Sequence, residues 1–108
     1  MSEPFVASLR TSQDAPVPVG TPGVGALTIR VEVPERWDVA LLSAAPTASV
    51  ADVKLAALRT VSPEDDASEY VIKLRGFEVL DESVSIATAG ARDGSIFLLT
   101  HRRRRPVR

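Results

Sequence analysis

The sequence predicts an α+β fold with five strands and one main helix. Three observations support this prediction: alternation of apolar and polar residues begins at residue 27, a helical period follows from residue 50, and alternation returns from residue 70. The expected order is strand, strand, helix, strand, short strand, helical turn, strand. A chain of 108 residues has room for one such domain with one modest core.

The first half of the domain is expected to be a hairpin followed by a helix. "ALTIRVEV" alternates with the period of a strand that buries one face, Pro34 interrupts the ladder in "PERW", and "DVALLSA" resumes it. Ser49 and Asp52 then resemble a capping box at the start of a helix of about three turns. The apolar stripe of that helix consists of Val50, Val53, Ala57, Leu58 and Val61.

The second half returns to strands. "EYVIKLRG" alternates, "FEVL" is long enough for a brief fourth strand, and "ESVSIATAG" fits one helical turn. "DGSIFLLT" opens on a turn dipeptide and closes as the last strand.

Both ends of the chain differ in composition from the domain. Residues 1–25, with "SQDAPVPVGTPGVG", are rich in Pro and Gly and are expected to form a flexible arm. Residues 26–101 form the predicted domain, and residues 102–108 form a basic tail. Residues 26–100 carry a net charge of −5, which the five arginines of the tail offset, so the chain averages to −1.

Composition excludes several classes of function. The chain has no cysteine, hence no disulfide, thiolate metal site or cysteine nucleophile. No apolar run approaches the roughly 20 residues of a membrane span and no signal peptide is visible, so a soluble, cytoplasmic protein without membrane contact is expected. The only imidazole, His101, adjoins the arginines, and no acidic pair has further ligands for a metal. We therefore expect no catalytic residue, metal, cofactor or small-molecule substrate.

The order of elements and the stretch "VIKLRGFEVLDESVSIATAGARDGSIFLLTHR" resemble ubiquitin and its β-grasp relatives. This resemblance implies a mixed sheet in the order 2-1-5-3-4, with the helix packed across one face. It also implies a core made of Leu27, Ile29, Val31, Val39, Leu41, Val53, Leu58, Ile72, Leu74, Leu80, Ile86, Phe97 and Leu99.

The chain differs from ubiquitin at the C-terminal Gly-Gly through which ubiquitin-like modifiers are conjugated. No Gly-Gly pair occurs, and "RRRRPVR" stands where a modifier would carry it. In this respect the chain resembles bacterial-type ubiquitin-like proteins that lack the pair, such as those of type VII secretion, and the small accessory subunits of multicomponent monooxygenases. Those proteins dock on a larger protein, so the resemblance implies a non-catalytic interaction or adaptor module.

Strand alternation predicts where such a partner binds. The outer face of the sheet is expected to carry an apolar patch that includes Ile96, Leu98 and Val71, with a basic rim suited to a partner with an acidic border. The predicted binding residues are Arg30, Val71, Lys73, Ile96, Leu98 and Thr100, and Arg75 extends the rim.

The arginine run leaves alternatives open. Its residues, Arg102, Arg103, Arg104, Arg105 and Arg108, either lie over an acidic rim of the domain or contact an anionic partner. That partner is an acidic protein or a nucleic acid bound without base readout. A protein modifier with an unorthodox C-terminus is a more distant alternative.

Overall fold

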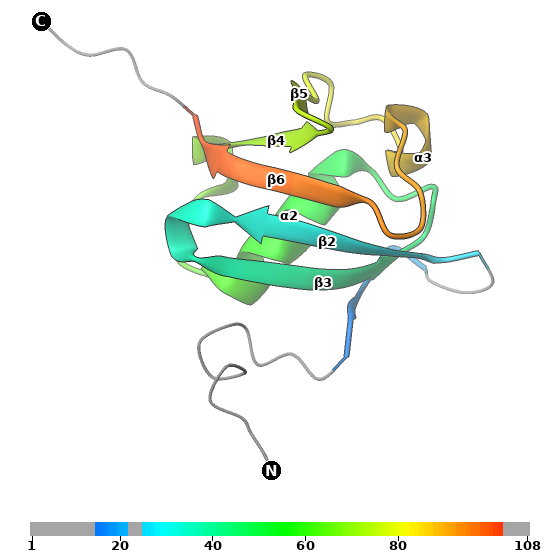
Figure 1. Cartoon of the computed structure of the whole chain (residues 1–108), viewed down its shortest axis with the longest axis horizontal. Coiled ribbons are helices and arrows are strands. Elements are labelled where there is room, and N and C mark those ends of the chain that lie inside the picture. Colours follow the sequence, from blue (N-terminus) through cyan, green and yellow to red (C-terminus); the bar gives the residue numbers. More distant parts are fainter. Residues whose placement is uncertain (1–14, 22–24, 103–108) are drawn as a thin grey trace, which may run out of the picture.

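The computed structural model describes residues 15–21 and 25–102 and shows one mixed sheet with a helix behind it (Figure 1). The sheet has six strands in the order β1-β3-β2-β6-β4-β5. Helix α2 (Val50–Val61) covers one face, and among the described residues no helix or strand covers the other. No helix in the described part of the chain is long and apolar enough to cross a membrane.

The predicted hairpin is present. Strands β2 (Leu27–Val33) and β3 (Asp38–Ala44) pair antiparallel and are joined by a short 3-10 helix, η1 (Pro34–Arg36). Trp37 closes the turn with its N–H donating to the Pro34 carbonyl at 3.0 Å, and its backbone is left-handed with φ of 55°. A bulky side chain rarely adopts this conformation, since its Cβ crowds the neighbouring backbone.

The capping box predicted for α2 is confirmed. The Ser49 hydroxyl accepts the backbone N–H of Asp52 at 3.0 Å, which satisfies one of the donors that the first helical turn leaves free. The buried stripe also includes Lys54, which is only 4% exposed and pairs with Glu82 at 3.0 Å. This ion pair keeps a charge at the margin of an otherwise apolar face.

The second half follows the predicted order. It consists of η2 (Ala67–Glu69), β4 (Tyr70–Leu74), β5 (Phe77–Glu78), α3 (Ile86–Ala89) and β6 (Ile96–His101). Strand β6 lies parallel to β2 and antiparallel to β4 in the middle of the sheet. The five predicted strands therefore take the expected order 2-1-5-3-4.

A sixth strand comes from a segment that was expected to belong to the arm. Strand β1 (Val17–Val19) pairs parallel with β3, and the Ala45 N–H donates to the Val19 carbonyl at 3.1 Å. Val19 is 4% exposed and packs into the core. Composition misled the prediction because three residues around a proline carry too little periodicity to identify a strand, whereas the edge of β3 provides the missing partner. Residues 1–14 and 22–24 of the predicted arm lie outside the described part of the chain.

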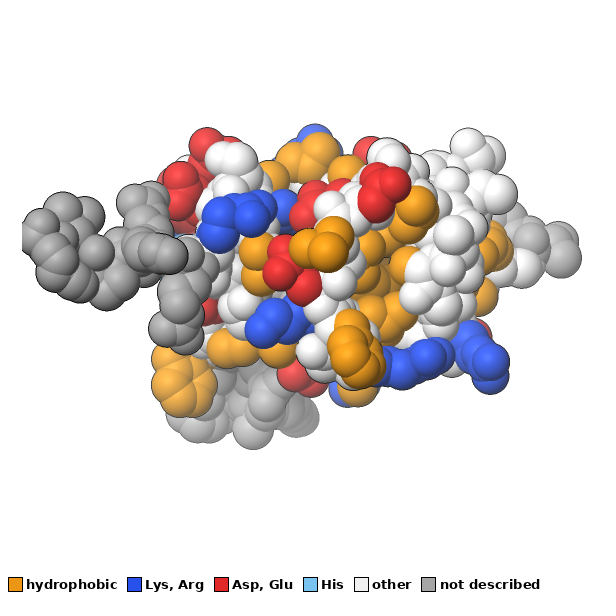
Figure 2. All heavy atoms as spheres, turned by 90° about the horizontal axis from the view of Figure 1, so that it is seen from above, with side chains coloured by type: hydrophobic (Ala, Val, Ile, Leu, Met, Phe, Trp, Pro, Cys, Tyr) orange, Lys and Arg blue, Asp and Glu red, His pale blue; other side chains and the backbone are white. Residues whose placement is uncertain are grey.

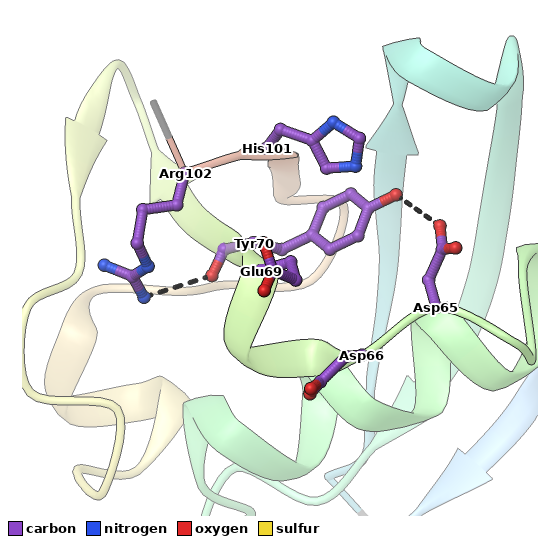
Figure 3. A pocket seen from close by; sticks show the side chains of 6 residues that line it. All are labelled: Asp65, Asp66, Glu69, Tyr70, His101 and Arg102. Carbon is purple, nitrogen blue, oxygen red and sulfur yellow. Dashed lines mark hydrogen bonds between the residues drawn. The ribbon is translucent and has the colours of Figure 1, made fainter. Parts of the chain in front are cut away.

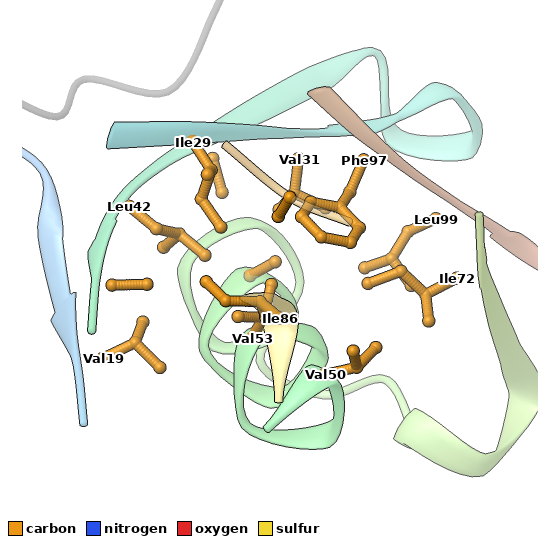
Figure 4. Packing of buried hydrophobic residues seen from close by; sticks show 14 of the residues in the cluster. Val19, Ile29, Val31, Leu42, Val50, Val53, Ile72, Ile86, Phe97 and Leu99 are labelled. Carbon is orange, nitrogen blue, oxygen red and sulfur yellow. The ribbon is translucent and has the colours of Figure 1, made fainter. Parts of the chain in front are cut away.

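The core lies between the sheet and α2 (Figure 4). Most predicted core residues are buried in it, including Ile29, Phe97 and Leu99. Three predictions are wrong: Val39 and Leu41 are half-buried on the outer face, and Leu80 is 84% exposed.

These three wrong predictions come from two shifts of one residue, one in β3 and one after β5. In β3, Ala40 and Leu42 point inward because they pair with Val31 and Ile29 of β2. After β5, Val79 packs against the core in place of Leu80, and its N–H donates to the Ile72 carbonyl at 2.9 Å. A shift of one position moves a strand residue to the opposite face.

Candidate functional site

The face of the sheet opposite α2 carries the residues predicted to bind a partner. Pairing across the strands arranges them in rows, because residues in register share a face. One row joins Leu41, Arg30 and Ile96. The next joins Val39, Glu32, Leu98, Lys73 and Glu78.

A third row pairs Val71 with Thr100. The structure thus brings together all six predicted binding residues on one face.

The apolar part of this face differs from the prediction in extent. Ile96 is 47% exposed and Leu98 is half-buried, but Val71 is only 8% exposed and offers little surface. Val39 and Leu41, which were expected in the core, add apolar surface across β2. The accessible apolar area therefore lies on β6 and on β3, with Arg30 and Glu32 of β2 between the two parts.

The rim of the face is not simply basic. Glu32 lies in register with Leu98, and Glu78 with Lys73. Arg75 stands in the turn after β4 with φ of 55°, and its guanidinium donates to the Gly90 carbonyl at 3.0 Å. Acidic and basic side chains alternate along the rim, and Arg75 is turned toward α3.

A shallow depression of about 540 Å³ crosses this face between β6 and β5. Its lining residues are Glu35, Val71, Lys73, Glu78, Thr100, His101 and Arg102. The depression offers apolar, hydroxyl and charged groups side by side, as a docking surface for a side chain or loop of another protein does.

A second pocket, of about 290 Å³, lies at the end of β6 (Figure 3). Tyr70 forms its floor, and its O–H donates to Asp65 at 2.6 Å. The Arg36 guanidinium reaches the same carboxylate from η1 at 2.8 Å. Donation from Tyr70 and Arg36 lowers the pKa of Asp65 to about 2, and burial together with the Asp65 bond raises the pKa of Tyr70 to about 12. Both groups keep their ordinary charge state at neutral pH, so this network joins η1, the loop before η2 and β4.

The same pocket fixes the start of the arginine run. The Arg102 N–H donates to the Glu69 carbonyl at 2.7 Å, and its guanidinium donates to the carbonyls of Ser68 at 3.2 Å and Tyr70 at 3.4 Å. Arg102 is therefore held by backbone carbonyls. Arg103, Arg104, Arg105 and Arg108 lie outside the described residues.

The remaining ionisable groups of the described residues were compared with the requirements of a metal site. No cluster of three or more His, Asp or Glu side chains suited to a metal occurs there. His101 lies tilted against the Tyr70 ring with 4.5 Å between ring centroids. Asp66 accepts the backbone N–H of Ser68 at 3.0 Å, which lowers its pKa. Asp81 accepts the hydroxyl of Ser83 at 2.5 Å and the backbone N–H of Ser83 at 3.0 Å, and these bonds lower its pKa. These carboxylates stabilise turns.

Sequence analysis missed three exposed apolar side chains. Trp37 is 89% exposed, Phe77 is 78% exposed, and Leu80 is 84% exposed. Phe77 begins β5 and Leu80 follows its end by two residues. Figure 2 views this side of the domain from above and shows orange apolar side chains between red and blue charged ones. The missed signal was the position of Trp37 and Phe77 directly after the turn residues of "PERW" and "RGF".

Comparison with known proteins identifies the fold of the chain but not its family. No protein-family model matches the chain, and no curated protein matches it. Ubiquitin of Caldiarchaeum subterraneum has a similar structure, with 19% identity and a TM-score of 0.63 over 73% of this chain and 96% of its own. A ubiquitin-like domain from Arabidopsis thaliana is 13% identical, with a TM-score of 0.61 over 82% of this chain and 90% of its own.

The C-terminal ubiquitin-like domain of mouse tubulin-specific chaperone e is also similar. It is 18% identical, with a TM-score of 0.58 over 82% of this chain and 97% of its own. The chain therefore has the ubiquitin-like α+β fold that its sequence resemblance implied.

Proposed function

We propose that this ubiquitin-like domain is a non-catalytic interaction module that docks on a larger protein through the open face of its sheet. The observation that carries the proposal is the position of Ile96 and Leu98. They lie on the central strand β6, on the face that α2 leaves uncovered, and Ile96 is 47% exposed. Strand β6 is hydrogen-bonded to a neighbour on each side, so the backbone that carries Ile96 and Leu98 is held in place in the free protein. Such preorganisation lowers the entropy cost of binding.

The chemistry of the face defines the partner. Ile96 and Leu98 form an apolar pair on β6, Arg30 of β2 lies between Ile96 and Leu41, and Lys73 of β4 lies on the other side of Leu98. Interfaces combine an apolar centre with a polar rim in this way. We propose a partner with an apolar anchor for the β6 surface and carboxylates placed opposite Arg30 and Lys73.

We further propose that the docking is non-covalent and cytoplasmic. The chain contains no Gly-Gly pair, which is the feature that ubiquitin-like modifiers use for conjugation. The adaptor role of bacterial-type ubiquitin-like proteins that lack this pair is the model for the proposal.

Site-specific crosslinking in the native host tests the proposal. A photoreactive amino acid at position 96 should yield one dominant crosslinked protein. The matched control places the same group at Leu55, which is 43% exposed on α2 at the other side of the domain. The same products from both positions, or none from position 96, would contradict the proposal.

Two substitutions separate binding from folding. Leu98→Ser should weaken the crosslink and spare the fold, because Leu98 is half-buried on the outer face. Leu99 is fully buried, so Leu99→Ala should cost about 2–5 kcal/mol of stability. Equal destabilisation by both substitutions would mean that the outer surface of β6 is needed for the fold instead.

A further inference from the structure

The turn between β4 and β5 carries an arginine in an unusual conformation. Arg75 and Gly76 connect the two strands, and both backbones are left-handed, with φ of 55° and 84°. Asparagine or aspartate is the usual residue at the first position of such a turn, since larger side chains are strained there. An arginine in this place therefore indicates a use for its side chain beyond the turn itself.

Phe77 follows this turn on the α2 side of the sheet, at the edge that the helix leaves uncovered. It is in register with Leu74, so the two side chains share a face. Leu74 is 6% exposed and belongs to the core, whereas Phe77 is 78% exposed. The open face with Ile96 and Leu98 is the opposite one, so Phe77 is not part of the surface proposed above for a larger partner.

Phe77 borders a pocket between β5 and α3, which lie at the same side of the domain (Figure 1). This β5 pocket has a volume of about 300 Å³ and is lined by Leu74, Arg75, Phe77, Glu78, Val79 and Ala89. Single exposed apolar residues are common on soluble proteins, but an exposed aromatic side chain beside an apolar pocket forms a contiguous patch. Such patches mark interaction surfaces.

The β5 pocket also carries one positive and one negative side chain. The Arg75 guanidinium donates to the Gly90 carbonyl at 3.0 Å, and its other N–H groups remain for further bonds. Within the described part of the chain, the ion pairs are those of Arg36 with Asp65 and of Lys54 with Glu82. Arg75 and Glu78 are therefore both able to pair with charges on another molecule.

This combination of groups suits a second copy of the same chain. In a two-fold dimer the same patch faces itself, so one patch must supply both members of every contact. The β5 pocket contains an aromatic side chain together with a pocket to receive one, and a cation together with an anion. Phe77 of one copy can enter the pocket of the other, while Arg75 of one copy pairs with Glu78 of the other.

We propose that the protein forms a two-fold dimer through the β5 pocket. A patch built around one aromatic side chain is smaller than the roughly 800 Å² that each partner buries in a stable complex, so the association is weak and reversible. The contact does not include Ile96 or Leu98, so failure of this proposal would leave the proposed docking of a larger protein untouched.

Sedimentation velocity of the full chain tests the dimer. Between about 10 μM and 1 mM, the sedimentation coefficient should rise from that of a monomer towards that of a dimer. Phe77→Ser should weaken the association by at least about 30-fold, the effect of losing a central aromatic contact. The matched control is Trp37→Gly, which removes a side chain that is 89% exposed next to β3, three strands away from β5, and should leave association unchanged.

Exchange of the two charges tests the two-fold arrangement. Arg75→Glu and Glu78→Arg should each remove the association, because like charges then face each other at both contacts. An equimolar mixture of the two variants should associate again, since opposite charges meet at both contacts. Thermal unfolding of each variant separates loss of the contact from loss of the fold. Phe77→Ser changes an exposed position and tests the contact even where substitution of Arg75 disturbs the turn.

Several results would overturn the inference. A monomer at every concentration would do so and would leave the β5 pocket to a different protein. Association that Phe77→Ser does not weaken would place the contact elsewhere on the domain. A mixture of the charge variants that stays monomeric would exclude the pairing of Arg75 with Glu78. Growth beyond a dimer would indicate a head-to-tail contact, which a two-fold axis does not allow.

Discussion

Deleting β1 tests the largest difference between the structure predicted from composition and the structure observed. A chain that begins at Gly20 lacks Val17–Val19 and with them the strand on the outer edge of β3. The Pro/Gly-rich sequence predicts no change in stability, whereas the structure predicts a substantial loss.

The magnitude follows from two contributions of Val19. Its side chain is 4% exposed, and burial of a valine contributes about 1.5–3 kcal/mol. Its carbonyl accepts the Ala45 N–H at 3.1 Å, and such a bond contributes about 0.5–1.5 kcal/mol net. We expect the truncation to lower the free energy of unfolding by about 2–5 kcal/mol, a large part of the roughly 5–15 kcal/mol typical of a domain.

Urea unfolding followed by circular dichroism measures this loss. A truncation that begins at Ala15 and keeps β1 is the matched control and should unfold like the full chain. Val19→Ala removes two methyl groups and should cost about 1–2 kcal/mol on its own. If the chain that begins at Gly20 unfolds within about 0.5 kcal/mol of the control, β1 adds no stability and the reasoning from burial fails.

Three further predictions concern the pocket, the buried charge and the turn. The pKa of Asp65 is lowered to about 2 and that of Tyr70 is raised to about 12, so their stabilisation should be present from about pH 4 to 10 and be lost below and above it. Asp65→Asn should flatten the acid limb of a plot of melting temperature against pH and only weaken the alkaline limb, because the burial of Tyr70 remains. Glu82→Ala should destabilise by about 3–5 kcal/mol because it strands the Lys54 charge, whereas Lys54→Met should be neutral or stabilising in urea unfolding. Equal losses for these two would contradict that reading. Trp37→Gly should change stability by less than about 1 kcal/mol, because relief of the left-handed strain offsets the greater freedom of unfolded glycine.

The fold was predictable because its longest patterns are local. Strand β2 alternates over seven residues, and α2 starts at a capping box that the sequence shows directly. Where a run is apolar on both faces, alternation does not determine which residues point inward. "VALL" in β3 is such a run, and pairing of Leu42 with Ile29 decides the matter. The same ambiguity between Val79 and Leu80 follows β5.

The candidate site was predictable only in part. Because successive residues of a strand point to opposite faces, the assignment of Phe97 and Leu99 to the core placed Ile96 and Leu98 on the outer face of the sheet. The mixed rim was missed although alternation in β2 puts Glu32 on the same face as Arg30; that Glu32 lies beside Leu98, and Glu78 beside Lys73, follows from strand pairing, which no local pattern reveals.

The position of β1 also affects the tendency of the sheet to pair with the sheet of another molecule. A long, unpaired strand edge is a template for intermolecular pairing and aggregation. Strand β1 occupies the edge of the seven-residue strand β3 along Leu42–Ala44, and at the opposite side the sheet ends in β5, which has two residues. Strand β1 therefore covers part of the β3 edge, and its removal should increase self-association of the protein as concentration rises.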